Sequence, residues 1–198
     1  MSVEPASADE RERWEARYAT REGEVGHPPS DWVVRQCLAL PADTLILDVA
    51  GGVGRHAIPL ARSGRTVVVV DFILRAVRAA RATHPLVLGA VADASALPIR
   101  ERSVAAIVAV NFLDRSIFPS LAGALCHGGV LVYETFTRHH LKLVESGRAR
   151  GPRTAKFLLG DGELERLVAP LEIREYAEGL VADAAGERHV ARVVAVKV

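Results

Sequence analysis

The stretch Leu45-Ile-Leu-Asp-Val-Ala-Gly-Gly-Val-Gly-Arg-His-Ala57 decides the fold of this chain. An apolar run leads to Asp48, a loop with three glycines follows, and helical spacing begins within Gly54–Arg62. Because glycine lacks a Cβ, the backbone of such a loop can turn sharply and approach a ligand closely. The start of the following helix offers unpaired N–H groups, which favour a negatively charged ligand. The stretch predicts a strand, a ligand-binding turn and a helix, the first unit of an open α/β sheet.

On both sides of this stretch, short apolar runs alternate with segments of helical spacing. The runs are nearly continuous in hydrophobicity, which is typical of strands buried on both faces of a parallel sheet. Units of this length imply right-handed crossovers, with helices on both faces of the sheet. We expect strands at Thr44–Val49, Thr66–Val70, Leu86–Val91, Ala105–Val110 and Gly129–Thr135, and helices at Asp31–Leu40, Gly54–Arg62, Phe72–Thr83, Arg115–Cys126 and Asp161–Val168.

The C-terminal part has a different pattern. Two strand-like runs, Leu171–Val181 and His189–Val198, are joined by the turn-rich stretch Ala182–Arg188. Runs joined this closely can pair only in an antiparallel way. The predicted fold class is therefore α/β, a Rossmann-like three-layer sandwich whose seven-stranded sheet is mostly parallel and ends in an antiparallel C-terminal hairpin. Thr137–Lys156 shows no clear period and receives no assignment.

Length and composition restrict the class of protein. The chain has 198 residues, 25 Lys and Arg against 24 Asp and Glu, and a net charge of +1. One domain over residues 1–198 accounts for this length, and the charge gives no overall attraction to nucleic acid or to an anionic membrane. Cys37 and Cys126 form no Cys-x-x-Cys pair, and the polar, acidic start is unlike a signal peptide. We expect a cytoplasmic protein with no membrane or nucleic-acid partner.

Acidic residues follow three successive predicted strands. Asp48 ends the first, Asp71 ends the second, and Asp93 follows the third. Ligands of open α/β sheets bind at these carboxyl ends, and an acid after the second strand can accept hydrogen bonds from both hydroxyls of a ribose. Each acid alone could be a helix cap, and the glycine loop alone could be a tight turn. Their order and spacing together favour a nucleoside site.

Two kinds of nucleoside ligand fit this edge. The pattern Gly52-x-Gly54-x-x-Ala57, with Asp71 on the ribose, also satisfies the fingerprint of dinucleotide-binding proteins. Against NAD, the chain lacks room for a second nucleotide-binding half and a substrate domain. In addition, Asp48 would face a pyrophosphate with like charge, whereas it suits a cationic amino group. A nicotinamide oxidoreductase stays the alternative.

The segment from Asp48 to Gly54 resembles motif I of the class I S-adenosylmethionine-dependent methyltransferases, with Ala50 in place of the usual first glycine. The resemblance covers roughly Leu45 to Val198. The N-terminal Trp14 and Tyr18 are similar to a helix that covers the cofactor in small bacterial, tellurite-resistance-like methyltransferases, which makes residues 1–30 a cofactor-covering segment. The resemblance implies a cofactor site for S-adenosyl-L-methionine made of Trp14, Tyr18, Asp48, Ala50, Gly51, Gly52, Gly54, Arg55, Asp71, Phe72, Asp93, Ala94 and Asn111.

By the same resemblance, the reaction is methyl transfer by in-line displacement, and the acceptor is a small molecule because no nucleic-acid module or nucleophile motif is present. No catalytic side chain is strictly required, and the candidates for a base are Glu134, His139 and His140. The adjacent histidines lack metal-ligand spacing, so we expect no metal site. Residues 137–156 are expected to be a substrate-side insertion. A third possibility is a non-catalytic methyltransferase-like module that serves a partner protein.

Overall fold

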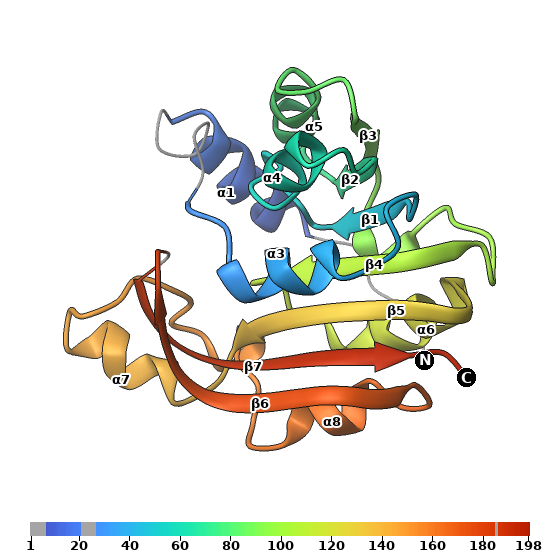
Figure 1. The fold of residues 1–198 in the computed structure, drawn as a ribbon. Helices are drawn as coiled ribbons and strands as arrows, with labels where there is room; N and C mark the ends of the chain where they lie inside the picture. Colours follow the sequence, from blue (N-terminus) through green and yellow to red (C-terminus); the bar gives the residue numbers. More distant parts are fainter. Residues whose placement is uncertain (1–6, 21–26, 185) are drawn as a thin grey trace.

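The computed structural model describes residues 7–20, 27–184 and 186–198. Seven strands form one sheet in the order β3-β2-β1-β4-β5-β7-β6 (Figure 1). The first five strands are parallel. β7 runs antiparallel between β5 and β6, which confirms the predicted fold class of a mostly parallel sheet with an antiparallel C-terminal hairpin. The strands are β1 (Ile46–Val49), β2 (Val67–Asp71), β3 (Val87–Val91), β4 (Val104–Val110), β5 (Leu125–Phe136), β6 (Glu172–Asp183) and β7 (Gly186–Val196).

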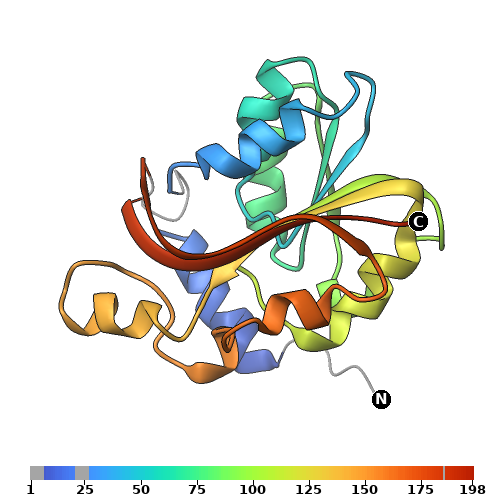
Figure 2. The same ribbon diagram turned by 60° about the horizontal axis from the view of Figure 1, so that its bottom comes forward.

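Helices cover both faces of the sheet. One face packs on α3 (Asp31–Leu38), α4 (Ala57–Arg62) and α5 (Leu74–Arg81), and the other on α6 (Phe118–Ala124) and α8 (Glu163–Leu167). In Figure 2 the blue α3 and the orange α8 lie on opposite sides of the curved red hairpin. All four residues of β1 are buried, as a central parallel strand requires. No helix in the described part of the chain is long and apolar enough to cross a membrane.

Two predicted helix boundaries are wrong, and glycine geometry explains one of them. The predicted helix Gly54–Arg62 begins only at Ala57, because Gly54 has a φ of 81°, which an α-helix does not allow. The predicted helix Arg115–Cys126 becomes a 3₁₀ turn at Arg115–Ile117 and α6, which ends at Ala124. Leu125 instead pairs with Val104 at the start of β5.

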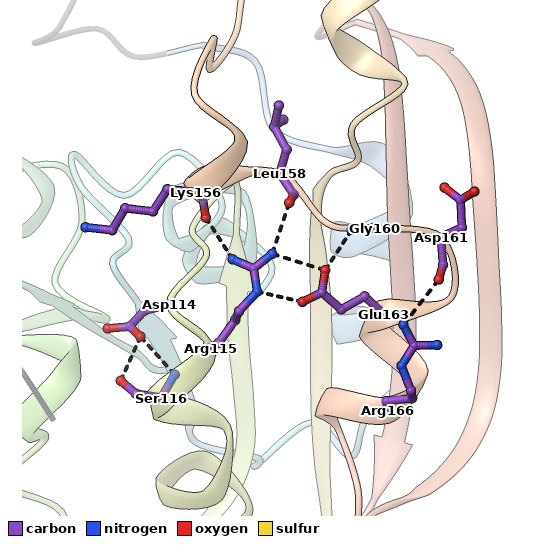
Figure 3. A network of polar contacts seen from close by, with 9 residues as sticks. All are labelled: Asp114, Arg115, Ser116, Lys156, Leu158, Gly160, Asp161, Glu163 and Arg166. Atoms are coloured by element: carbon purple, nitrogen blue, oxygen red, sulfur yellow. Dashed lines mark hydrogen bonds and ion pairs between the residues drawn. The ribbon is translucent and has the colours of Figure 1, made fainter. Parts of the chain in front are cut away.

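The unassigned segment has a defined path. It contains α7 (His140–Glu145) and a 3₁₀ turn at Ala155–Phe157, and its two ends meet where Thr137 bridges to Leu159. Figure 3 shows how Arg115 anchors its far end. The Arg115 guanidinium donates to both carboxylate oxygens of Glu163, at 2.6 and 3.1 Å, and to the carbonyls of Lys156 and Leu158. A bidentate arginine of this kind fixes geometry more firmly than a single surface ion pair does.

Candidate functional site

The glycine loop after β1 is built from left-handed backbone. Ala50, Gly52 and Gly54 have φ values of 54°, 57° and 81°. Ala50 stands at the position where the motif usually has glycine, and its Cβ makes this conformation cost about 1–2 kcal/mol. The loop is held to β2, because the Gly52 N–H donates to the Asp71 carboxylate at 3.0 Å. The strained loop is therefore fixed by the neighbouring strand at the carboxyl edge of the sheet.

Two charged side chains, Asp48 and Arg55, lie beside this loop. Asp48 is 2% exposed, and its Oδ2 has no hydrogen-bond partner among the described residues. Burial raises the pKa of Asp48 to about 7, against the opposing effect of Arg55. No hydrogen bond within the described residues involves the Arg55 side chain, and burial lowers its pKa while Asp48 raises it. A buried acid and a guanidinium that lack hydrogen-bond partners within the described residues can bind the amino and carboxylate groups of an amino-acid moiety.

The acids of β2 and β3 have structural partners. The Asp71 carboxylate accepts hydrogen bonds from the N–H groups of Gly52 and Ile73, and burial raises its pKa against the effect of these bonds. Asp93 accepts from the N–H of Ser95 at 3.0 Å, as a cap of the turn that contains the buried Ala94. Each acid thus positions its own loop and still presents lone pairs to a ligand.

The first helix, α1 (Ala8–Tyr18), lies across this edge. Trp14 and Tyr18 stack at 5.7 Å and pack against Val53 and Ile73. The Tyr18 hydroxyl sits so close to Gly52 that a Cβ there would collide with it. Burial and the nearby carboxylate of β2 raise the pKa of this phenol. The structure therefore places α1 over the glycine loop.

Arg11 of α1 joins two residues that the sequence assigned to one ligand. Its guanidinium lies 5.0 Å from the centre of the Phe72 ring and 3.2 Å from Oδ2 of Asp93. Phe72 and Asp93 both belong to the cofactor site that the resemblance implies. In this structure, the Arg11 guanidinium contacts both of them.

Asn111 adds a further unsatisfied atom at the same edge. It follows β4 with a φ of 57°, and its N–H donates to the Glu134 carbonyl at 2.8 Å. Its Oδ1 is buried and has no hydrogen-bond partner in the part of the chain that the structure describes. Buried polar atoms are nearly always hydrogen bonded, so an orphaned oxygen here indicates a place for a donor.

Glu134 is the centre of a buried network that sequence reasoning missed. It is fully buried, and its two oxygens accept hydrogen bonds from Arg188 at 2.6 Å and from the Ser30 hydroxyl at 3.1 Å. Arg188 also pairs with Asp183 at 2.7 Å, and the Ser30 N–H donates to Nε2 of His56. The partners come from the α3 entrance, α4 and the hairpin, so no local pattern could have found them.

The two candidate histidines lie at the start of α7, away from the glycine loop. His140 is fully buried, and its ring nitrogens contact the Arg150 carbonyl and the His189 N–H. His139 contacts Asp161 at 3.0 Å on the surface. These bonds give both histidines local structural roles.

Comparisons with known proteins agree with this geometry. Residues 46–129 match the methyltransferase domain family. A structure of an S-adenosylmethionine-dependent methyltransferase from Methanosarcina mazei has a TM-score of 0.68 and 22% identity, over 86% of this chain and 99% of that one. TehB from Haemophilus influenzae gives 0.67 and 20%, over 95% and 67%. A methyltransferase solved in complex with the Haloferax volcanii Trm112 activator gives 0.67 and 17%, over 99% and 97%.

At these identities, the structural similarity establishes the fold, and the family match covers residues 46–129 only. No curated protein matches the sequence. The resemblance predicted from the glycine loop is thereby confirmed for the fold, and the stretch that carries it lies within the matched residues. The individual site residues stay predictions, which the geometry above makes specific.

Proposed function

We propose that this chain, a class I S-adenosylmethionine-dependent methyltransferase by its domain and its fold, transfers the cofactor methyl group to a small-molecule acceptor by in-line displacement. The observation that carries the proposal is the pair of buried oxygens at the carboxyl edge, Oδ2 of Asp48 and Oδ1 of Asn111, which have no partner among the described residues. Arg55, whose pKa Asp48 raises, is the cation beside the glycine loop.

The residues fit the cofactor. The unpartnered Oδ2 of Asp48 suits the cationic amino group of the methionine part, and Arg55 suits its carboxylate. Asp71 would accept hydrogen bonds from the ribose hydroxyls, and Phe72 and Asp93 would contact adenine. For the last two contacts to form, Arg11 has to leave its present position between them.

The chain's own residues mainly bind, orient and exclude water. When bound, S-adenosylmethionine supplies a methyl group already activated by the positive charge on its sulfur. Asp48 and Arg55 would fix the methionine part, so that an acceptor can be aligned with the methyl carbon. Trp14 and Tyr18 would keep water from the glycine loop. Because both oxygens of Glu134 are hydrogen bonded, we assign it to positioning, and the proposal includes no general base.

The domain match and the fold favour methyl transfer over the nicotinamide alternative. The third possibility, a module that serves a partner, has one related observation, the solved complex of a structural neighbour with a Trm112 activator. Residues 137–156 keep their expected role as a substrate-side insertion, and a cytoplasmic location stays a prediction.

Calorimetry with S-adenosylhomocysteine tests the proposal. We expect binding by the wild-type chain and at least about tenfold weaker binding by Asp71→Asn, since a lost hydrogen bond to a charged group costs about 1.5–3 kcal/mol. Asp43→Asn, on the surface before β1, is the matched control and should bind as the wild type does. Binding of NAD in place of S-adenosylhomocysteine would contradict the proposal. A coupled assay for S-adenosylhomocysteine release then screens acceptors.

A further inference from the structure

The β6–β7 hairpin carries a recess that no step above uses. Its lining includes Ala177, Gly179, Val181, Val190 and Arg192, and we name it the hairpin recess. Directly paired residues of an antiparallel ladder point to the same face, and Ala177 pairs with Arg192 while Gly179 pairs with Val190. A Cβ added at Gly179 would meet no atom within 4 Å. The small residues of β6 therefore leave open space beside Arg192.

Arg192 lines this recess, and one of its guanidinium nitrogens is unsatisfied. Its Nε is buried without a hydrogen-bond partner, and within the described residues Arg192 forms no ion pair. The guanidinium carbon lies 5.2 Å from the centre of the Trp32 ring. The indole is itself fixed, because its N–H donates to Glu175 at 2.8 Å. Arg192 is thus held in place with part of its donor capacity unused.

The carboxylates near the recess have other partners. Glu134 lies opposite Arg192 in the β5–β7 register, but its oxygens accept from Arg188 and Ser30. Glu178 accepts hydrogen bonds from the Gly162 N–H and from the hydroxyl of Tyr176, which lies on the same face of β6. Neither carboxylate forms an ion pair with Arg192.

The recess connects with the cofactor end of the site through Arg188. Arg188 pairs with Val181 in the β6–β7 register and reaches Glu134 at the carboxyl end of β5. Its charge also acts on Arg55, which lies beside the glycine loop. The recess therefore lies on the hairpin that also reaches the carboxyl end of β5, next to the proposed cofactor site.

We propose that the hairpin recess binds a carboxylate group of the methyl acceptor, with Arg192 as the residue that recognises it. The acceptor is then a small organic acid, whose apolar part contacts Val181 and Val190. A guanidinium matches a carboxylate in a planar, two-pronged geometry, and it does so more strongly where water is partly excluded. This inference rests on the proposed methyltransferase function and names its substrate class.

A binding experiment tests the recess with benzoate as the probe and neutral benzamide as its control. In the wild-type chain saturated with S-adenosylhomocysteine, calorimetry should detect binding of benzoate and no binding of benzamide. Arg192→Gln should weaken benzoate binding at least about tenfold. Arg174→Gln removes an exposed arginine of the same hairpin and should change nothing.

Kinetics provide the second readout. In a screen of paired carboxylic acids and primary amides, Arg192→Gln should raise KM for an acid at least about tenfold and leave kcat within about threefold. Arg192→Lys keeps the positive charge but loses the two-pronged guanidinium, so its KM should lie between those of the wild type and Arg192→Gln. Equal binding of benzoate by wild type and Arg192→Gln, with S-adenosylhomocysteine affinity intact, would overturn this inference alone. Failure of the wild type to bind S-adenosylhomocysteine would overturn the proposed function itself.

Discussion

The buried carboxyl of Asp48 should lower the free energy of unfolding of the free protein at neutral pH, and replacing Asp48 tests this. Burial raises the pKa of Asp48 from its ordinary 3.8 to about 7 in the folded chain. The folded state then binds a proton more tightly than the unfolded state does between these values. Stability therefore decreases as pH rises from about 4 to 7 and stays reduced above pH 7.

The magnitude follows from the shift. About three pKa units at about 1.4 kcal/mol each give a cost of about 4 kcal/mol above pH 7. Asn has the same shape and no charge, but its amide would add an unsatisfied donor that costs about 1–3 kcal/mol. We expect Asp48→Asn to gain about 1–3 kcal/mol over the wild type at pH 8, and to lose that advantage at pH 4. Urea unfolding of the free protein at both pH values measures the difference.

The same substitution should weaken binding of the cofactor. The carboxylate of Asp48 has to be ionised to hold an amino group, so the wild-type affinity for S-adenosylhomocysteine should rise with pH up to about 7. Asp48→Asn should bind at least about tenfold more weakly at pH 8 and show no such pH dependence. The reasoning about stability would be refuted if, in urea unfolding, Asp48→Asn were less stable than the wild type by the same amount at pH 8 and at pH 4.

Three further substitutions test the surroundings of the site. Gly52→Ala should weaken binding of S-adenosylhomocysteine and displace Tyr18, because the new Cβ would collide with the Tyr18 hydroxyl. Faster hydrogen exchange of the α1 amides would show the displacement. Arg11→Ala should tighten S-adenosylhomocysteine binding several-fold in calorimetry, since it frees the predicted adenine contacts, whereas Arg13→Ala should not. Arg188→Met should lower the free energy of unfolding by about 3–5 kcal/mol, because it leaves the buried glutamate of β5 without its cation; unchanged urea unfolding would contradict this.

Periodicity and glycine placement were enough to predict the sheet. Apolar runs such as Thr66–Val70 are typical of strands buried on both faces, and the closely joined C-terminal runs can only be antiparallel, so the fold class and the strand directions followed from local patterns. The helix at Arg115–Cys126 was too long, because pairing between Val104 and Leu125 is a tertiary contact that overrides local helical spacing.

The cofactor edge was readable because its acids follow successive strands in sequence. The network around Glu134 was not, since Ser30 and Arg188 lie 104 and 54 positions from it and have no spacing in common. The position of Arg11 also had no sequence signal, because it depends on how α1 docks. Local motifs thus predicted which residues lie at the carboxyl edge of the sheet, and long-range packing decided which side chains surround them.

The docking of α1 has a consequence for kinetics. None of its residues is buried, and its described contacts run through the glycine loop, α5, Phe72, Asp93 and the turn at Ala155–Phe157. The Tyr18 hydroxyl lies against the loop that would hold the cofactor, so we expect α1 to move before a nucleoside binds at Asp71. The observed association rate of the cofactor should then level off at high concentration, at the rate at which α1 opens. Turnover would be limited by a helix that takes no part in the chemistry.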